Sequence, residues 1–363
     1  MKRIWIQRIG AAVLCAVLLA GCMPGGPAAD STASADPLTG RQEQQYPGQR
    51  PAAVVIDNAP GSTTQWGIGS ASVVLEAAAR ADTAPSLCLV YPSVSAMPTV
   101  GPVTLGQDLF WRLLSGQQVL PIQRGCDPYT RNFLDYWNLR AVDALETGRN
   151  AFTTGNTDWA SPLWCTNGQS VAKVLSSLSL SSALSEDPAE SADSTQEGDT
   201  PAVPTVPALL PQQTDGHLPD ADVADAVQAA VQFPSGSTTR FAYDTDTGTY
   251  GMLHHDGTPQ LDANTGTQAA FDNLLVLYSA STPRDDGRTL DYDLTMGGGL
   301  WLNGGHLWHI TWTQGTGSTF AFYDADGRPL RILSGRSYIA WLSSLTGEEV
   351  TVQDSAGNDL LQP

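Results

Sequence analysis

The sequence has 363 residues, in which 37 acidic side chains outnumber 18 basic ones and give a formal net charge of −19. So acidic a surface repels nucleic-acid phosphates and anionic envelope polymers. Basic residues form no local run that would offset this repulsion, and beyond the first 22 residues Lys173 is the sole lysine. We therefore expect no nucleic-acid partner.

The first 22 residues predict a lipoprotein leader. Three cationic residues precede an apolar stretch at 9–20, which is too short to cross a bilayer that needs about 20 residues. The stretch runs into Leu-Ala-Gly-Cys at 19–22, which resembles the lipobox of bacterial lipoproteins. We expect 1–21 to be a signal peptide and Cys22 to carry the lipid, with the chain anchored at the extracytoplasmic face of the cell membrane. The alternative is an ordinary signal peptide with an incidental cysteine.

The next two segments predict a tether and an α/β domain. Residues 22–45 are rich in Pro, Gly, Ala and Ser, as flexible tethers are. Strands and helices alternate in residues 46–183, and this order favours an α/β layer. The expected strands lie at 53–56 and around Cys88, and the expected helices at 68–80, 104–115, 129–137 and 169–180.

Residues 184–219 interrupt this pattern. They are rich in acidic residues, Pro, Ser and Thr, and they lack Lys and Arg. Because such a composition buries too little apolar surface to offset ordering, we predict a disordered insertion or linker. Three aspartates at 220–225 then favour a helix that reaches residue 231.

From residue 241 onward the pattern indicates short strands and tight turns. Asn303-Gly304 and Asp326-Gly327 are typical of hairpins. In the alternating segment 306–312, Trp308, Ile310 and Trp312 share one face. We therefore predict a mostly antiparallel β-rich domain over 220–363, an α+β fold class for the chain, and no segment after the leader that spans a membrane.

Metal and cofactor motifs are weak. His306 and His309 lie three residues apart on a predicted strand, so their side chains point to opposite faces. Aspartate pairs precede Gly248 and Gly327, where carboxylates favour tight turns as readily as calcium, and no acidic twelfth ligand of an EF-hand follows. The sequence predicts neither a metal site nor a cofactor.

Candidate catalytic groups are equally sparse, and we assign no catalytic residue. Carboxylates and an amide that a cleft could bring together are Asp57, Asn58, Glu76 and Asp108, although spacing alone does not unite them.

The cysteines allow one disulfide. Cys88 lies in an apolar strand and is expected in the core. Cys126 and Cys165 are able to pair in an oxidising compartment, but their spacing does not establish the bond.

The ordered series of motifs resembles the YerB-like lipoprotein family, from about residue 37 to 343 apart from the acidic insertion. The resemblance implies a lipid-anchored surface protein with an α/β N-terminal part and a β-rich C-terminal part, of no established activity. The segments that carry it are 38–40, 50–58, 65–71 and 101–103 in the first half, and 241–244, 257–262, 265–266, 273–276, 297–301, Trp308, Trp312, 323–324 and 326–327 in the second.

Two polar motifs of that family are absent here. Where the resemblance implies Gly-Pro-Val-Arg-Ser-Ala-Arg, the chain has Thr104 and Gln107 in place of both arginines. Where it implies Pro-His-Asn, the chain has Pro162, Leu163 and Trp164. Arginines with a histidine and an asparagine would suit an anion or carboxylate, so we expect any such site to be lost or repurposed.

These observations favour a non-enzymatic binding or scaffold module of the cell envelope, whose partners are the membrane and an envelope protein. The main alternative is a hydrolase or transferase acting on envelope material through Asp57, Glu76 or Asp108. A third option is a solute receptor for a transporter, which the absence of two similar lobes weakens.

Overall fold

A computed structural model of the chain describes residues 35–42, 44–62, 64–154, 163–185, 203–214, 218–315 and 319–361. The predicted leader, Cys22 and most of the tether lie outside these residues, as does the centre of the acidic insertion. Residues 35–363 form one unit by their internal contacts.

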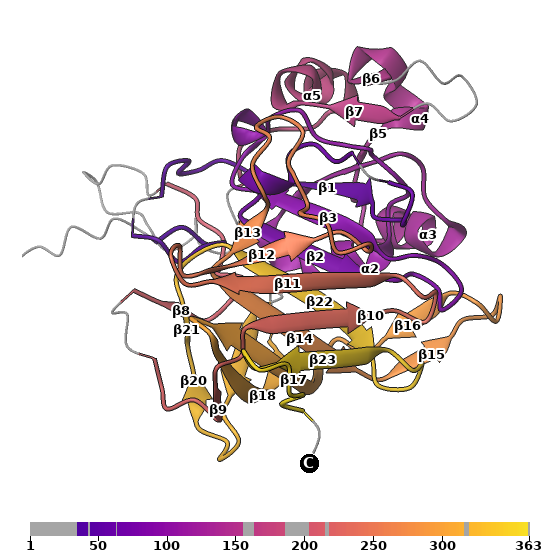
Figure 1. The fold of residues 1–363 in the computed structure, drawn as a ribbon. Coiled ribbons are helices and arrows are strands. Elements are labelled where there is room, and N and C mark those ends of the chain that lie inside the picture. The colour runs from indigo at the N-terminus through magenta and orange to yellow at the C-terminus, as the bar shows by residue number, and fades with distance from the viewer. Residues whose placement is uncertain are drawn as a thin grey trace, which may run out of the picture. The chain divides into compact units, whose positions relative to one another are not determined.

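A twelve-stranded sheet organises the described residues, and it draws strands from both halves of the sequence (Figure 1). The C-terminal strand β22 lies between β14 and β2 and is parallel to both. The sheet therefore continues across the domain boundary expected near residue 220. Its strands in spatial order are β20 (Pro329–Leu330), β19 (Phe320–Tyr323), β18 (His306–Gln314), β17 (Met296–Asn303), β14 (Asn273–Ser279), β22 (Ser337–Ser343), β2 (Val73–Ala77), β3 (Ser86–Tyr91), β1 (Ala52–Asp57), β4 (Leu120–Gln123) and β5 (Val142–Asp143), with β9 (Val223–Ala224) beside β18.

Smaller sheets and short helices cover this large sheet. A five-stranded sheet consists of β13 (Ala270–Phe271), β12 (Thr249–Leu253), β11 (Thr238–Asp244), β10 (Gln228–Gln232) and β23 (Glu349–Gln353). Three two-stranded sheets pair β15 (Ser281–Pro283) with β16 (Leu290–Tyr292), β8 (Gln212–Gln213) with β21 (Ile332–Leu333), and β6 (Phe152–Thr154) with β7 (Trp164–Thr166). The helices are η1 (Ile68–Ser70), η2 (Val94–Ala96), α2 (Asp108–Leu113), η3 (Ser115–Gln117), α3 (Pro128–Tyr136), α4 (Ala144–Thr147), η4 (Gly148–Asn150), α5 (Gly168–Leu175) and η5 (Ser176–Leu178).

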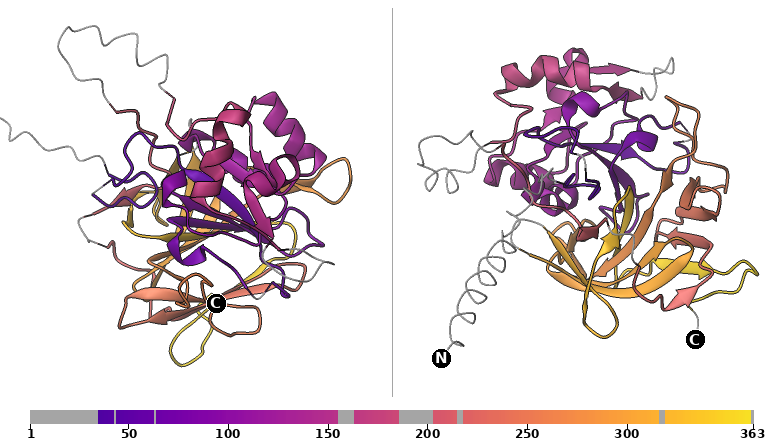
Figure 2. Two further views of the ribbon diagram at one scale, coloured as in Figure 1. Left: turned by 90° about the horizontal axis from the view of Figure 1, so that it is seen from above. Right: turned by 90° about the vertical axis from the view of Figure 1, so that its left-hand side faces the viewer.

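Both faces of the large sheet are buried, each in its own hydrophobic cluster. The five-stranded sheet packs on one face through residues such as Phe241 and Phe271. Helix α2 packs on the other through Phe110 and Trp111, together with aromatic side chains such as Trp312. Seen from above, the strands of the small sheet lie toward the bottom of the view and the purple and magenta helices toward the top (Figure 2). Helix α5 packs on the same face as the five-stranded sheet, through residues such as Val171 and Val174.

Two of the predicted helices are strands. The helix expected at 68–80 is wrong, because all five residues of β2 are buried and its paired valines favour extended backbone. The helix expected up to residue 231 is also wrong. Ala229 and Val231 point into the core while Gln228 and Gln232 are exposed, which is the alternation of a strand.

Other elements agree with the prediction. The strands at 53–56 and around Cys88, a helix over 128–136 and the helical turns over 168–178 are present. The helix expected at 104–115 is confined to Asp108–Leu113. The fold is mostly β with some α and a β-rich C-terminal region, but the α/β arrangement expected for the N-terminal half is not confirmed, because β1, β2 and β3 form an antiparallel set.

Candidate functional site

The buried carboxyl of Glu76 lies where the twelve-stranded sheet and the five-stranded sheet meet. Its side chain has no exposed surface. Asn58 donates a 2.6 Å hydrogen bond and Thr239 a 2.9 Å hydrogen bond to Oε1, and Tyr338 donates to Oε2. These donors come from the end of β1, from β11 and from β22, so one carboxyl links three strands that are far apart in the sequence.

A shell of amides and one histidine completes this network. Gln65 Nε2 donates to Asn58 Oδ1 at 3.0 Å, and Gln260 Nε2 donates to Gln65 Oε1 at 3.0 Å. His255 Nε2 lies 2.8 Å from the Asn58 carbonyl oxygen. Burial raises the pKa of Glu76, although the three donated hydrogen bonds and His255 act in the opposite direction. The network is closed to solvent, which suits a structural role better than contact with a substrate.

The four polar residues proposed from the sequence do not form one cleft. Asn58 and Glu76 meet, as described. The Asp57 carboxylate instead accepts from the backbone N–H of Ala59 at 3.2 Å and closes a turn after β1. Asp108 pairs with Arg284 at 2.6 Å and with Arg112 at 3.7 Å, so it belongs to a separate cluster of charges.

The disulfide considered between Cys126 and Cys165 is not formed. Cys88, Cys126 and Cys165 are all free thiols. Cys165 lies in β7, opposite Thr153, whereas Cys126 pairs with Gly106 through a backbone bridge, so the two thiols are held by different neighbours. Burial raises the pKa of Cys165 to about 11, so its thiol is a poor nucleophile near neutral pH.

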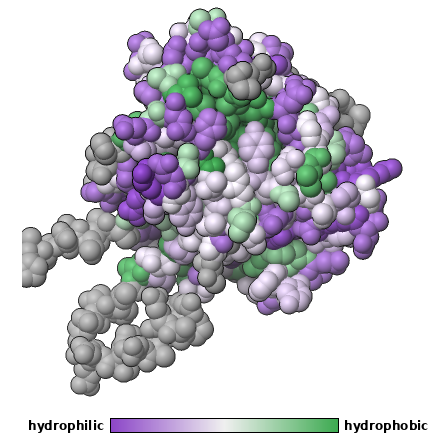
Figure 3. Space-filling view, turned by 90° about the horizontal axis from the view of Figure 1, so that it is seen from below, coloured by the Kyte–Doolittle hydropathy of each residue, from purple (hydrophilic) through white to green (hydrophobic). Residues whose placement is uncertain are grey.

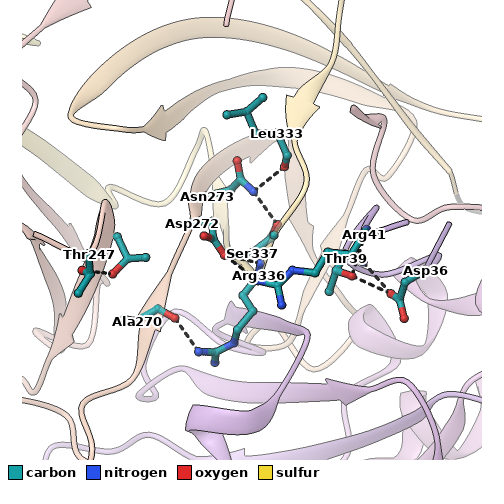
Figure 4. A network of polar contacts seen from close by, with 12 residues as sticks. Asp36, Thr39, Arg41, Thr247, Ala270, Asp272, Asn273, Leu333, Arg336 and Ser337 are labelled. Carbon is teal, nitrogen blue, oxygen red and sulfur yellow. Dashed lines mark hydrogen bonds and ion pairs between the residues drawn. The ribbon is translucent and has the colours of Figure 1, made fainter. Parts of the chain in front are cut away.

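The glycine-containing segment 65–71 is held by two charged groups from the C-terminal half, the buried Asp262 and the partly buried Arg336. Asp262 accepts from the N–H groups of Gly67 and Gly69 at 3.1 and 2.8 Å. Gly67 has a φ of +91°, and a Cβ there would lie 2.5 Å from the Tyr91 hydroxyl. Arg336 donates to the carbonyl oxygens of Ile68 and Ala71 at 2.8 Å. It also donates to the carbonyl oxygen of Ala270 at 2.7 Å (Figure 4). These contacts explain structurally why the motif needs its glycines.

Residues 104–107, where two arginines were expected, lie beside residues 163–164, where a histidine and an asparagine were expected. The N–H of Val103 donates to the carbonyl oxygen of Trp164 at 2.7 Å, and the Arg124 guanidinium lies 5.9 Å from the Trp164 ring. Among the described residues, Gln107 Oε1, Arg124 Nε and Trp164 Nε1 are buried without a hydrogen-bond partner. Such atoms cost about 1–3 kcal/mol each, so the hydrogen-bonding capacity of this region is not fully used.

An open groove lies between α3 and the β15–β16 hairpin, with a volume of about 1070 Å³. This is slightly above the usual range for small-molecule sites, roughly 300–1,000 Å³. Apolar and aromatic side chains of Phe133, Trp137, Leu139, Tyr292 and Leu294 contribute to its lining. Polar lining groups include Arg112, Ser115, Ser281, Thr282, Asp291, Asp293, Thr295 and Gln314. Sequence reasoning missed this groove, because its walls come from segments more than 100 residues apart.

Ion pairs fix the two walls of the groove. The Asp291 carboxylate oxygen Oδ1 lies 2.7 Å from Arg112 and 3.2 Å from Arg284, and both arginines also pair with Asp108. The Arg284 guanidinium lies 4.8 Å from the centre of the Tyr129 ring on α3. Asp108, a residue singled out from the sequence, therefore supports the groove from outside its lining.

Helix α3 positions the exposed aromatic wall. Asp127 caps its N-terminus by accepting from the N–H of Thr130 at 2.7 Å, and Pro128 occupies the first turn. Phe133 and Trp137, four residues apart, then lie on the same side with ring centres 6.4 Å apart. Trp137 remains 61% exposed, which leaves its ring available for a ligand.

Replacing Asp127 with alanine should lower the free energy of unfolding by about 1 kcal/mol, because the cap hydrogen bond is lost. Denaturant titration monitored by tryptophan fluorescence measures the change. Asp135→Ala is the matched control, since this exposed aspartate lies near the other end of the helix, where a negative charge is unfavourable. Equal loss of stability in the two variants would contradict the capping role.

The face seen from below is mostly hydrophilic (Figure 3). Seen from below, hydrophilic and intermediate residues occupy most of the molecule, and hydrophobic ones gather near the top of the view and in smaller spots (Figure 3). In the part of the chain that the structure describes, no helix has the length and apolarity to span a membrane. The same described residues contain no group of three or more His, Cys, Asp or Glu side chains arranged to hold a metal ion.

The chain is similar to proteins of one family along most of its length. Residues 38–181 match the N-terminal domain, and residues 229–339 the C-terminal domain, of the protein of unknown function DUF3048. The chain is 26% identical to the putative lipoprotein YerB of Bacillus subtilis over 321 residues, 87% of this chain and 88% of that protein. The crystal structure of Bacillus subtilis YerB matches with a TM-score of 0.70 at 22% identity, covering 88% of this chain and 99% of that chain. With both domains present in order and the fold shared, the chain belongs to the YerB-like DUF3048 family as a divergent member.

Proposed function

We propose that this protein is a lipid-anchored binding module of the cell envelope, held by Cys22 at the extracytoplasmic face of the membrane, and that it binds through the groove between α3 and the β15–β16 hairpin. The groove itself is the observation that carries this proposal. It combines an aromatic wall with polar groups, which is the usual character of a ligand site. The name of the relative as a putative lipoprotein supports the anchor.

The position of the carboxyl groups favours binding over catalysis. General acid–base catalysis needs a titratable group within hydrogen-bond reach of the substrate. Glu76 has no exposed surface, and Asp108 is 6% exposed and paired with two arginines. The groove carboxylate Asp291 is paired with the same two arginines, and such charge-assisted pairs favour a stable, preorganised wall.

Replacing Cys22 with alanine should release the protein from the membrane. Two acyl chains contribute about 0.8 kcal/mol for each buried CH₂ group, and without them no other anchor is expected. Fractionation of cells that express either form, with labelled palmitate as a second readout, measures the effect. Cys88→Ala is the matched control. Unchanged membrane association and labelling in the Cys22 variant would contradict the anchor.

The binding role is tested by photo-cross-linking on intact cells. A photoreactive amino acid in place of Thr282, an exposed residue of the groove, should yield a specific adduct with an envelope component. The same probe in place of Leu345, which is 69% exposed and lies outside the groove, is the control. Adducts that are equal at the two positions, or absent from both, would overturn the proposal.

A further inference from the structure

We propose that the groove binds a neutral polysaccharide made of pyranose units, as a refinement that rests on the proposed binding function. A pyranose has a face of C–H groups and an edge of hydroxyl groups. The groove offers complementary chemistry for both, and the following observations concern its aromatic wall, its hydrogen-bond acceptors and its charge.

The aromatic wall suits the apolar face of a sugar ring. Trp137 is 61% exposed and its ring is braced edge-on by Tyr136, with ring centres 5.3 Å apart. Phe133 supports it from the preceding turn of α3. An indole held in this way offers a broad flat surface at little cost in side-chain entropy. Such a surface packs well on the C–H face of a pyranose.

The opposite wall presents acceptors two residues apart. Asp291 uses Oδ1 for its two arginines, and Asp293 uses Oδ1 for the N–H and hydroxyl of Thr295, at 2.8 and 2.7 Å. In the described residues, Oδ2 of each aspartate has no hydrogen-bond partner. Hydrogen bonds from Thr295 lower the pKa of Asp293, so its carboxylate stays ionised and only accepts hydrogen bonds. A ligand at this wall must therefore supply donors, as sugar hydroxyls do.

The charge of the groove favours a neutral ligand. Its charged lining consists of one basic residue, Arg112, and two acidic ones, Asp291 and Asp293. An anionic polymer would meet these carboxylates and the net charge of −19 of the chain. A cationic peptide would instead face Arg112, which lines the same groove. Hydroxyl groups bind these oxygens without that like-charge repulsion.

The test uses the full lipidated chain in zwitterionic detergent, so that no sugar headgroup competes, and the neutral β-1,4-linked tetramer of N-acetylglucosamine as the probe. Isothermal titration calorimetry and tryptophan fluorescence should detect saturable binding that changes little with salt. Trp137→Ala should weaken binding about tenfold or more, and Asp293→Asn should also weaken it. Leu345→Ala is the control, because this side chain is 69% exposed and lies outside the groove. It should bind within about twofold of the unsubstituted protein.

Three results would overturn the polysaccharide proposal: no binding of the tetramer at millimolar concentration, equal binding by the Trp137 variant, or salt-sensitive binding of tetralysine in its place. Unchanged unfolding midpoints of the variants would show that the substitutions leave the fold intact. If the tetramer fails while Thr282 still cross-links to a protein in cells, the polysaccharide proposal falls and the binding function stands. If neither succeeds, both fall.

Discussion

Replacing Arg336 with methionine should lower the free energy of unfolding by about 3–5 kcal/mol, because three carbonyl oxygens lose their donor at once. These oxygens belong to Ile68 and Ala71 in the N-terminal half and to Ala270 in the C-terminal half. The guanidinium also lies 4.9 Å from the centre of the Phe271 ring, a cation–π contact that methionine does not replace. One side chain thus connects β13 and the start of β22 to the segment that precedes β2.

Equilibrium denaturation of purified protein measures this effect. Arg331→Met is the matched control. Arg331 lies five residues before Arg336 and is exposed, so its replacement should change the free energy of unfolding little. Arg336→Lys should recover only part of the loss, since an ammonium group is a point donor and does not reproduce the planar fork of donors. A loss below about 1 kcal/mol in the methionine variant would contradict the role assigned to Arg336.

The sequence predicted local elements well where the pattern is unambiguous. The hairpin at Asn303-Gly304 joins β17 to β18, and both Gly304 and Gly305 have positive φ, as a tight two-strand connection requires. Trp308, Ile310 and Trp312 are buried on one face, as expected from strict alternation. His309 is exposed, and its Nδ1 lies 3.2 Å from Asp222 Oδ2.

The error at β2 has a physical cause, which is burial on both faces of the large sheet. Val73, Val74 and Ala77 fit the apolar stripe of a helix, but they fit a doubly buried strand equally well. The placement of β2 beside β22 depends on pairing between residues more than 250 positions apart, which local pattern does not encode. The same holds for the groove, whose two walls are brought together only by the tertiary fold.

The polar residues show how much about a candidate site can be predicted from residue type alone. Asn58 and Glu76 were grouped as candidate chemistry and do form a direct hydrogen bond. What the sequence did not reveal was the surrounding shell of Thr239 and Tyr338, which seals the carboxyl inside the protein. Burial decides whether a carboxyl is a reactive group or part of the framework, and burial here is a product of strand order.

Glutamine in place of Glu76 should make stability depend less on pH. Burial raises the pKa of Glu76 in the folded protein above its value of 4.5 in the unfolded chain, so the folded state binds this proton more tightly. Its stabilising contribution is therefore complete below about pH 4.5 and is lost as pH rises through the folded-state pKa. Glutamine does not titrate, so this part of the pH dependence should disappear from the variant.

At low pH the Glu76→Gln variant should be less stable than the unsubstituted protein by about 1–3 kcal/mol, and the difference should narrow as pH rises. The amide retains an acceptor for Asn58 and Thr239 and donates one N–H to Tyr338, but its second N–H finds no partner among these three groups. Denaturant titrations at several pH values between 4 and 8 measure the difference, with the exposed Glu349→Gln as the control. A difference that stays constant or widens with pH would contradict the raised pKa and would mean that the three donors outweigh the cost of burying the carboxylate.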